Sequence, residues 1–273
     1  MPELPEVETA RSLIAGEALH RRIAGVDDAD TFVCRPHSPG QLRDALVGRE
    51  LTAARRRGKA MWCETSGAGR ATTPGPDLGI HLGMGGRIVV ASQSGRAVEG
   101  GGPRRRDAQP GKAEWNRFVL EFADGGSLTL VDKRRLGRVR LNPDIDALGP
   151  DAGEITPAEF RSLIMKGTIA VKGRLLDQSK IAGIGNLLAD EMLWKAKVPP
   201  SARAGSLQRT DADRLYRALR SALDSALAKG GVHTGDVIPA RRPGGECPRC
   251  GAEMKHGTVA GRSTWWCSRE QAA

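Results

Sequence analysis

The sequence is poor in aromatic residues, which make up 4% of its 273 positions and include a single tyrosine. Leu, Val, Ile and Ala must therefore fill most of the core that a hydrophobic content of 39% allows. No apolar run approaches the roughly 20 residues that a membrane-spanning helix needs. The opening stretch "MPELPEVETAR" lacks the basic start and the apolar run of a secretory signal. We therefore expect a cytoplasmic protein that contacts no membrane.

Cysteine is also scarce, with five residues in all. An odd number, together with the missing secretory signal, argues against a framework of disulfide bonds. Cys34 and Cys63 stand apart from the others, and we expect them to be small buried hydrophobic residues. The remaining three cysteines gather near the C-terminal end of the chain.

Positive charge is in excess. The chain carries 42 basic and 32 acidic residues, a net charge of +10, and its pI is about 9.8. Such an excess favours a polyanionic partner, above all nucleic acid. The abundance of Arg, Ala and Gly is also typical of a GC-rich genome, so both explanations of the charge stay open at this point.

The first half of the chain predicts a helix followed by a β-rich domain, over residues 2–142. Leu4, Val7, Leu13 and Ile14 give residues 2 to about 19 a partial apolar face, and the first turn is acidic, as a helix N-terminus favours. From about residue 22, short alternating stretches separated by turn signals such as "ADGG" indicate a β-sandwich. Residues 92–114 are typical of a mobile surface loop.

The second half predicts a helical domain. Residues 143–155 change in composition and form a linker, and residues 156–242 are helical. Thr156 is placed to cap a helix that has Pro157 at its first position. Leucines recur every fourth residue from Leu215 to Leu227, which predicts a long amphipathic helix. A Gly-rich tail, residues 243–273, completes a chain of the α+β multidomain class.

The N-terminus offers an unusual nucleophile. A Met that precedes a small residue is normally removed, which would expose the secondary amine of Pro2. An α-amine titrates near about 8 rather than the 10.4 of lysine, so part of it can attack a carbon at neutral pH. Glu3 is adjacent and could move protons. By composition alone, an ordinary helix start with Pro and Glu explains the same residues.

The string "MPELPEVETAR" resembles the N-terminus of the formamidopyrimidine-DNA glycosylase and endonuclease VIII family, on the formamidopyrimidine side. The resemblance covers most of the chain in the family's order: N-terminal helix plus β-sandwich, helix-two-turn-helix domain, and zinc-type β-hairpin. It implies a bifunctional DNA glycosylase and AP lyase of base-excision repair. The implied partner is damaged double-stranded DNA, and we expect a monomer associated with the bacterial nucleoid.

The resemblance implies catalytic roles for four residues. Pro2 would form a Schiff base with the sugar, and β- and δ-elimination would then cut the strand. Glu3 would open the sugar ring and shuttle protons, and Glu6 would support the site. Lys59, in "RRRGKAMW", matches a lysine on a β-hairpin that reaches the reaction centre.

The resemblance also implies five DNA contacts. Met84, in "HLGMGGR", would fill the gap left by the flipped base, and Arg134, in "DKRRLGRV", would face the orphaned base. Leu136 stands where the family usually has a wedge phenylalanine. Asn186, in "KIAGIGNLLADE", and Arg262, in "GRSTWW", would hold phosphates near the lesion. For Met84 and Leu136 separately, burial in the core is the competing interpretation.

The C-terminal cysteines predict a zinc site. Cys247 and Cys250 form "CPRC", and Cys267 follows at the spacing of a zinc hairpin. The family pattern implies a fourth cysteine at position 270, where this chain has Glu270. The fourth ligand is therefore open between Glu270, His256, a water molecule and none, and a hairpin without metal is the competing interpretation.

The segment between Gly231 and Cys247 is short, whereas formamidopyrimidine-type enzymes have a long segment there with a loop that closes over oxidised guanine. The preferred lesion is therefore open. One alternative is an AP lyase or a glycosylase for a bulky or pyrimidine lesion. Another is a non-catalytic DNA-binding paralogue, although pure binding requires neither Pro2 nor Glu3 nor Lys59.

Overall fold

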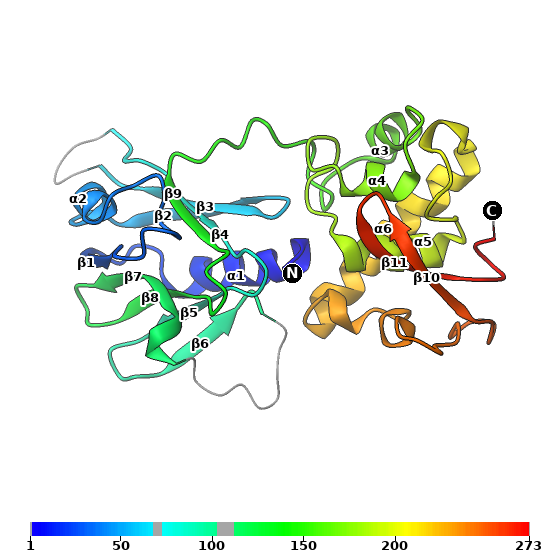
Figure 1. The fold of residues 1–273 in the computed structure, drawn as a ribbon. Coiled ribbons are helices and arrows are strands. Elements are labelled where there is room, and N and C mark those ends of the chain that lie inside the picture. Colours follow the sequence, from blue (N-terminus) through cyan, green and yellow to red (C-terminus); the bar gives the residue numbers. More distant parts are fainter. Residues whose placement is uncertain (1, 68–72, 103–111, 273) are drawn as a thin grey trace. The chain divides into compact units, whose positions relative to one another are not determined.

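The computed structural model describes residues 2–67, 73–102 and 112–272. The chain divides into two compact units. The first comprises Pro2 and residues 6–145, and the second comprises residues 3–5 and 146 onward. The N-terminal helix α1 (Leu4–Glu17) thus begins in the second unit and continues in the first. Both helices and antiparallel sheets are present, so the predicted α+β class is confirmed (Figure 1).

The first unit contains two antiparallel sheets (Figure 1). One has the order β1-β7-β8-β5-β6 and the other the order β2-β3-β4-β9. A single hydrophobic cluster takes side chains from both sheets and from α1, which is the packing of a β-sandwich. The strands are β1 (Ile23–Asp27), β2 (Leu51–Arg57), β3 (Ala60–Thr65), β4 (Leu78–His81), β5 (Arg87–Ala91), β6 (Ala97–Gly100), β7 (Asn116–Phe122), β8 (Ser127–Val131) and β9 (Arg138–Leu141), with a short helix α2 (Gln41–Leu46) between β1 and β2.

Alternation of side chains explains why these segments are strands. In β3 the residues Met61, Cys63 and Thr65 are buried, while the residues between them are partly exposed. Because successive side chains of a strand point to opposite faces, this pattern places one face of the sheet on the core. Aliphatic residues fill most of that core, as the scarcity of aromatics requires, and Phe118 and Phe122 are its only aromatic members among the described residues.

The expectation of a mobile loop over residues 92–114 was partly wrong. Ala97–Gly100 forms the edge strand β6, which pairs with β5 in antiparallel register, and Ala113–Trp115 forms a turn of 3-10 helix. The short polar turn at residues 92–96 closes a hairpin between β5 and β6. Residues 103–111 of the expected loop lie outside the described residues.

The second unit is helical with one two-stranded sheet (Figure 1). Thr156 and Glu159 form a reciprocal capping box at the start of the first of these helices, with Pro157 at its first position, as the sequence predicts. The helices are α3 (Pro157–Ile164), α4 (Val171–Leu176), α5 (Asn186–Ala196) and α6 (Arg209–Lys229), and strands β10 (Met254–Val259) and β11 (Arg262–Cys267) form the hairpin.

Two hydrophobic clusters stabilise this unit. The larger one takes the apolar faces of α3 to α6, including Leu215, Leu219 and Leu223, whereas Leu227 near the end of α6 is 40% exposed. The smaller one joins Trp194 of α5 to Cys247, Met254 and Cys267 of the tail. Among the described residues, no helix is long and apolar enough to cross a membrane.

Candidate active site and metal site

Glu3 lies at the N-terminus of α5. Its carboxylate accepts hydrogen bonds from the backbone N–H groups of Gly185, Leu187 and Leu188 at 2.9, 2.8 and 3.1 Å, and the residue is 1% exposed. The first N–H groups of a helix have no partner within the helix, and the helix dipole favours a negative charge beside them. The N-terminus of α5 therefore fixes the position of the Glu3 carboxylate.

Gly185 makes this arrangement possible. A Cβ atom at this position would lie 2.2 Å from Cδ of Glu3, which is closer than any real contact. The second glycine of "GIGN" is thus needed for the close approach of the Glu3 carboxylate. Pro2 precedes Glu3 and is buried, and Glu6 is also buried, at 5% exposed.

Lys59 lies at the tip of the hairpin between β2 and β3. The two-residue turn of Gly58 and Lys59 is closed by the pairing of Arg57 with Ala60, and Gly58 takes a φ of 60°. Glu8 of α1 anchors this hairpin through an ion pair with Arg56 at 2.8 Å. Burial alone would raise the pKa of Glu8, but hydrogen bonds from Arg11 and Arg56 outweigh it and lower the pKa.

His81, at the end of β4, was not singled out by sequence analysis. Its Nδ1 accepts a hydrogen bond from the N–H of Gly83 at 3.0 Å, which leaves the proton of a neutral ring on Nε2. Desolvation and the positive charges of Lys59 and Arg140 lower the pKa of His81. The one available signal was its place at the start of "HLGMGGR".

Met84 and Leu136 come from two loops that touch. Gly83, with a φ of 59°, passes so close to the other loop that an added Cβ would lie 2.4 Å from the carbonyl carbon of Leu136. Met84 is 44% exposed and Leu136 is partly exposed. The competing interpretation of Met84 as a core residue is therefore wrong, and the two apolar side chains come from adjoining surface loops.

Asp132 organises the loop that carries Arg134 and Leu136. Its buried carboxylate accepts hydrogen bonds from the N–H groups of Arg134, Leu136 and Gly137 at 2.9, 2.8 and 2.7 Å. One side chain thus fixes the whole turn, including Arg135 with its φ of 55°. Sequence analysis missed Asp132, although an Asp that opens a loop and bonds the following N–H groups is a recognisable turn signal.

Asn186 and the β10–β11 hairpin are in direct contact. Nδ2 of Asn186 donates to the carbonyl of Ser263 at 3.0 Å. Ala260 and Gly261, with φ of 50° and 72°, form the two-residue turn that places the exposed Arg262 at the first position of β11. The structure therefore brings Asn186 close to the strand of Arg262, although they are far apart in sequence.

A buried ion pair lies beneath this contact. Nζ of Lys172 lies 2.6 Å from the carboxylate of Asp190, and both side chains have no exposed surface. Lys172 also donates to Oγ1 of Thr264 at 2.7 Å, and Arg241 pairs with Asp190 at 2.9 Å. Desolvation lowers the pKa of Lys172, while Asp190 opposes that change. No pattern in the sequence indicates this network, because its members come from four separate segments.

Three thiols and a carboxylate form a group that can hold a metal ion. The ligand atoms of Cys247, Cys250, Cys267 and Glu270 all lie within 4.8 Å of one another, and the thiols of Cys250 and Cys267 are 3.4 Å apart. Burial raises the pKa of Cys247, but hydrogen bonds from the indole of Trp194 and from backbone N–H groups outweigh it and lower the pKa to about 7. The donor set and its spacing fit a tetrahedral site that binds thiolates.

Of the two side chains considered as the fourth ligand, Glu270 lies in the thiol group and His256 does not. His256 stacks on Trp265, with ring centroids 4.5 Å apart, and its Nε2 lies 3.0 Å from the hydroxyl of Ser263. It does not belong to the thiol group, whereas Glu270 does. The carboxylate of Glu270 is also paired with Lys197 at 2.7 Å and with Arg249.

Residues 232–246 form two short 3-10 turns, Val232–Thr234 and Ile238–Ala240. Glu191 of α5 holds them, because its carboxylate accepts hydrogen bonds from the N–H groups of Asp236 and Val237, each at 3.0 Å. This segment is therefore compact and closely held to α5.

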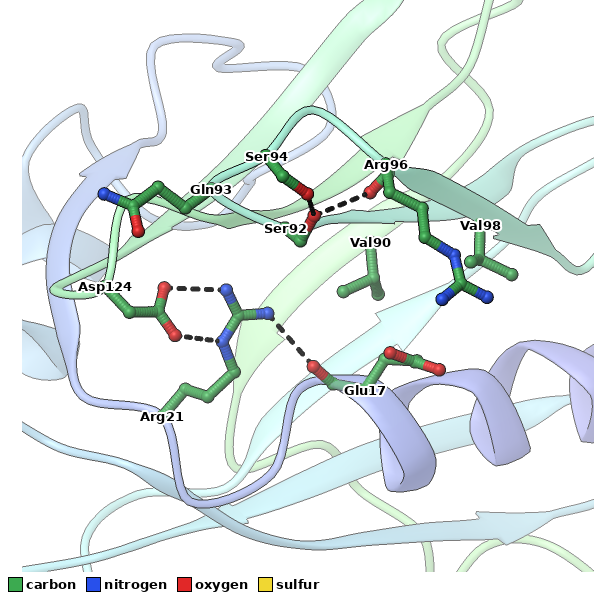
Figure 2. Close-up of a pocket in the computed structure, with 9 residues that line it drawn as sticks. All are labelled: Glu17, Arg21, Val90, Ser92, Gln93, Ser94, Arg96, Val98 and Asp124. Carbon is green, nitrogen blue, oxygen red and sulfur yellow. Dashed lines mark hydrogen bonds and ion pairs between the residues drawn. The ribbon is translucent and has the colours of Figure 1, made fainter.

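A cavity of about 490 Å³ lies elsewhere in the first unit, between the end of α1 and the β5–β6 turn (Figure 2). Arg21 on its wall forms two hydrogen bonds with Asp124, and none of the predicted site residues lines it. Its arginines face the acidic groups of Glu17 and Asp124, so the wall carries no net charge, and the chemistry described above lies elsewhere.

Comparison with known protein families identifies both parts of the chain. Residues 1–139 match the formamidopyrimidine-DNA glycosylase N-terminal domain, and residues 147–236 match the formamidopyrimidine-DNA glycosylase H2TH domain. A formamidopyrimidine-DNA glycosylase of Arabidopsis thaliana is 36% identical over 83% of this chain, which spans 58% of that relative. One from Corynebacterium aurimucosum is 33% identical over 98% of this chain and 95% of the relative.

Solved structures agree with the sequence comparisons. The Fpg of Lactococcus lactis in complex with DNA containing an abasic site has a TM-score of 0.78 and is 27% identical, covering 99% of this chain and all of that chain. The same protein with DNA containing FAPY-dG has a TM-score of 0.79 at 28% identity. On the two family matches and the full-length relatives, the chain belongs to the formamidopyrimidine-DNA glycosylase family.

Proposed function

We propose that the protein is a bifunctional DNA glycosylase and AP lyase that acts on damaged double-stranded DNA in base-excision repair. The position of Glu3 carries this proposal: a buried carboxylate, next in sequence to Pro2, is held by three N–H groups at the N-terminus of α5. An acid at this place can exchange protons with a group bonded to the adjacent Pro2, which a protein that only binds DNA does not require. Family membership supports the same activity.

The proposed reaction begins once Met1 has been removed. The nitrogen of Pro2 bonds to C1′ of the sugar while the glycosidic bond to the damaged base breaks, and opening of the ring gives an iminium ion. This ion acidifies the hydrogen on C2′, whose loss expels the 3′ phosphate, and a second elimination expels the 5′ phosphate. Glu3 takes the proton that the nitrogen of Pro2 loses on bonding to C1′ and returns it to the ring oxygen O4′ as the ring opens.

The remaining site residues bind the DNA in this proposal. The ammonium of Lys59 holds a phosphate at the reaction centre, with Glu6 supporting the site from within α1. Asn186 and Arg262 hold the backbone from the second unit. We also propose that Met84, Arg134 and Leu136 occupy the space that the flipped nucleotide leaves, because two of these side chains are apolar and come from adjoining surface loops. In this proposal the repair reaction takes place on the chromosome, in the cytoplasm.

We further propose that the thiol group with Glu270 holds one zinc ion. Three thiolates and a carboxylate would complete a tetrahedral set, and the ion would tie "CPRC" to the end of β11. Such an ion would stabilise the hairpin that carries Arg262 and would take no part in the chemistry on the sugar.

A second candidate concerns the lesion. The compact segment 232–246, which Glu191 holds against α5, is short for a loop that must close over an oxidised purine. This observation favours an enzyme that acts mainly on abasic sites or on oxidised pyrimidines, with the same chemistry at Pro2.

Borohydride trapping tests both candidates. Purified protein is incubated with duplexes that carry an abasic site, an oxidised purine or an oxidised pyrimidine, and borohydride reduces any imine to a stable adduct. We expect an adduct with the abasic site, and the relative yields on the two damaged bases identify the preferred lesion. Pro2→Gly should lower the trapping rate at least about a hundredfold, because a primary amine attached to a more flexible chain is less well oriented.

The control is a protein with a residual tag ahead of Pro2, which blocks the amine without changing any side chain. It should bind the abasic duplex with normal affinity and give no adduct. Trapping at the normal rate by the tagged protein would show that Pro2 is not the nucleophile.

A further inference from the structure

Phe32 is an exposed aromatic residue surrounded by arginines. It is 43% exposed, and the guanidinium carbons of Arg35, Arg138 and Arg135 lie 4.1, 4.8 and 5.8 Å from the centre of its ring. We call these four residues the Phe32 cluster. A cation over the face of an aromatic ring is attracted by the electron density of the ring. Three around a single exposed ring concentrate positive charge at one place on the surface.

One carboxylate balances only part of this charge. Asp30 receives two hydrogen bonds from Arg135, at 2.9 and 2.8 Å, and lies 3.7 Å from Arg117. Burial would raise the pKa of Asp30, but its hydrogen bond from Arg135 and those from backbone N–H groups outweigh it, so Asp30 stays ionised. Among the described residues, neither Arg35 nor Arg138 has an ion-pair partner. The cluster is therefore cationic after its internal pairing.

The cluster adjoins the loop with the proposed DNA wedge. Arg135 and Arg138 flank Leu136 in sequence, and Asp132 fixes the backbone between them. The carbonyl of Val33, next to Phe32, accepts a hydrogen bond from the N–H of Val139 at 2.9 Å. Arg138 also pairs across the sheet with His81. The segment of Phe32 thus extends the surface of the two loops.

We propose that the Phe32 cluster is a phosphate-binding extension of the DNA interface, in which Arg35 and Arg138 bind backbone phosphates of the strand opposite the lesion. The ring contacts each guanidinium by its face, so that the N–H groups at the edge can bind phosphate oxygens, apart from one at Nη1 of Arg138, which donates to the carbonyl of Gly137. The anionic backbone relieves the repulsion between the two arginines. The choice of strand rests on the proposed function, because Arg134 of the same loop would face the orphaned base.

Phe32 has a positioning role in this proposal. Arginine side chains lose rotamer freedom when they bind a phosphate, and stacking on a ring reduces that loss in advance. Tyrosine at position 32 would preserve the stacking surface, whereas alanine would remove it. The two substitutions therefore separate stacking from any effect of simply changing the residue.

The test is equilibrium binding of the full-length protein to a duplex with a non-cleavable abasic analogue, over a range of salt concentrations. Arg35→Gln and Arg138→Gln should each reduce the slope of log affinity against log salt by about 0.9, the value for one phosphate contact. Phe32→Ala should weaken binding about three- to tenfold at moderate salt, and Phe32→Tyr should retain normal affinity.

Arg96→Gln is the matched control. Arg96 is an exposed arginine of the same unit and lies on the β5–β6 turn (Figure 2). This turn follows the last residue of β5, whereas Met84 precedes the first. The substitution removes one positive charge and leaves the Phe32 cluster intact. The slope of log affinity against log salt should therefore stay unchanged. Thermal unfolding of each variant verifies folding, and the two arginine variants suffice if Phe32→Ala is unstable.

Unchanged slopes for both arginine variants would overturn the proposal, and so would slopes lowered equally by Arg96→Gln. If the cluster binds a protein partner instead of DNA, both arginine variants will have unchanged slopes. The binding assay uses a duplex that cannot be cleaved, so its result does not depend on whether the protein has the proposed lyase activity. If the arginine variants lower the slope but the protein gives no borohydride adduct, the lyase proposal is refuted and the cluster proposal is supported. If the protein is trapped normally but the slopes are unchanged, the cluster proposal is refuted and the lyase proposal is supported.

Discussion

Individual contacts decide the chemistry at the residue scale, and the contact between Glu3 and Gly185 is the clearest case. Both lie in motifs that the sequence displays openly, yet their mutual dependence is visible only in three dimensions. The carboxylate occupies the space that a side chain at position 185 would take. Substitution of the glycine therefore probes the acid without altering it.

Gly185→Ala should lower the rate of strand cleavage at abasic sites about a hundredfold, because a displacement of about 1 Å at a catalytic group has that effect. Overpacking should also reduce the free energy of unfolding by about 1–3 kcal/mol. Single-turnover cleavage and urea unfolding measure the two effects.

The control for that substitution is Gly16→Ala, in α1, the helix that directly follows Glu3, where no atom lies within 4 Å of the added Cβ. It should keep the normal cleavage rate and gain about 0.5–1 kcal/mol, because alanine favours a helix over glycine. Equal cleavage rates in the two variants would show that the position of Glu3 is irrelevant.

In the proposed function, DNA binding by the second unit depends on the hairpin β10–β11. The thiol group anchors one end of it, and Lys172, Asn186 and Asp190 anchor the tip. Lys172 and Asp190 orient this part of β11, since Lys172 donates to the carbonyl of Ser263 and to Oγ1 of Thr264, and Asp190 accepts from the N–H of Trp265. The two anchors come from different segments, so each can be tested separately.

Purified protein should contain about one equivalent of zinc, and Cys247→Ser should reduce it below about a tenth, because binding of the metal is coupled to folding of the hairpin. Glu270→Cys should retain zinc against a chelator for longer than the natural chain, since a fourth thiolate is the usual ligand of a structural site. Metal analysis before and after chelation measures both.

Cys63→Ser is the control for the metal. Cys63 is buried in the first unit, outside the thiol group, and burial raises the pKa of its thiol to about 12. Its substitution should leave the zinc content unchanged. If the unsubstituted protein, purified without chelator, contains no zinc, the proposed zinc site is refuted.

Charge acts at the scale of the whole molecule. Several carboxylates have a lowered pKa, for which hydrogen bonds from basic side chains or from a helix cap are responsible. The pKa of Asp124, beside Arg21, falls to about 2. Asp77 differs, because burial raises its pKa. The chain also has a net charge of +10 at neutral pH, which increases as carboxylates are protonated.

Stability should therefore be lost on the acid side. A carboxylate with a lowered pKa in the folded state contributes stability that is fully present above its unfolded pKa, and this is lost as the pH falls through the folded value. Urea unfolding should give a free energy that begins to fall below about pH 6.5, because burial and nearby cations lower the pKa of His81 in the folded state and the unfolded chain takes up its proton first. The carboxylates should add a steeper decline below about pH 4.5 that continues toward pH 2. A free energy that stays constant down to pH 3 would show that these ion pairs contribute nothing.

Local patterns made much of the fold predictable. Alternating side chains indicated the strands, Thr156 and Pro157 marked a helix start, and "CPRC" marked the metal group, because each signal acts over a few neighbouring residues. Specific strings also identified the family. The strand at residues 97–100 was missed, because a polar edge strand is determined by its partner β5 rather than by its own pattern.

The sequence by itself determined which chemical groups this protein has: a proline at position 2 beside an acid, an excess of basic residues and a cluster of thiols. Only the tertiary structure decided how they are used. Asp132 fixes a loop, Lys172 meets Asp190, and Phe32 gathers three arginines from segments up to about a hundred residues away. Such contacts depend on how distant segments pack, and no pattern within one segment encodes the identity of its partner.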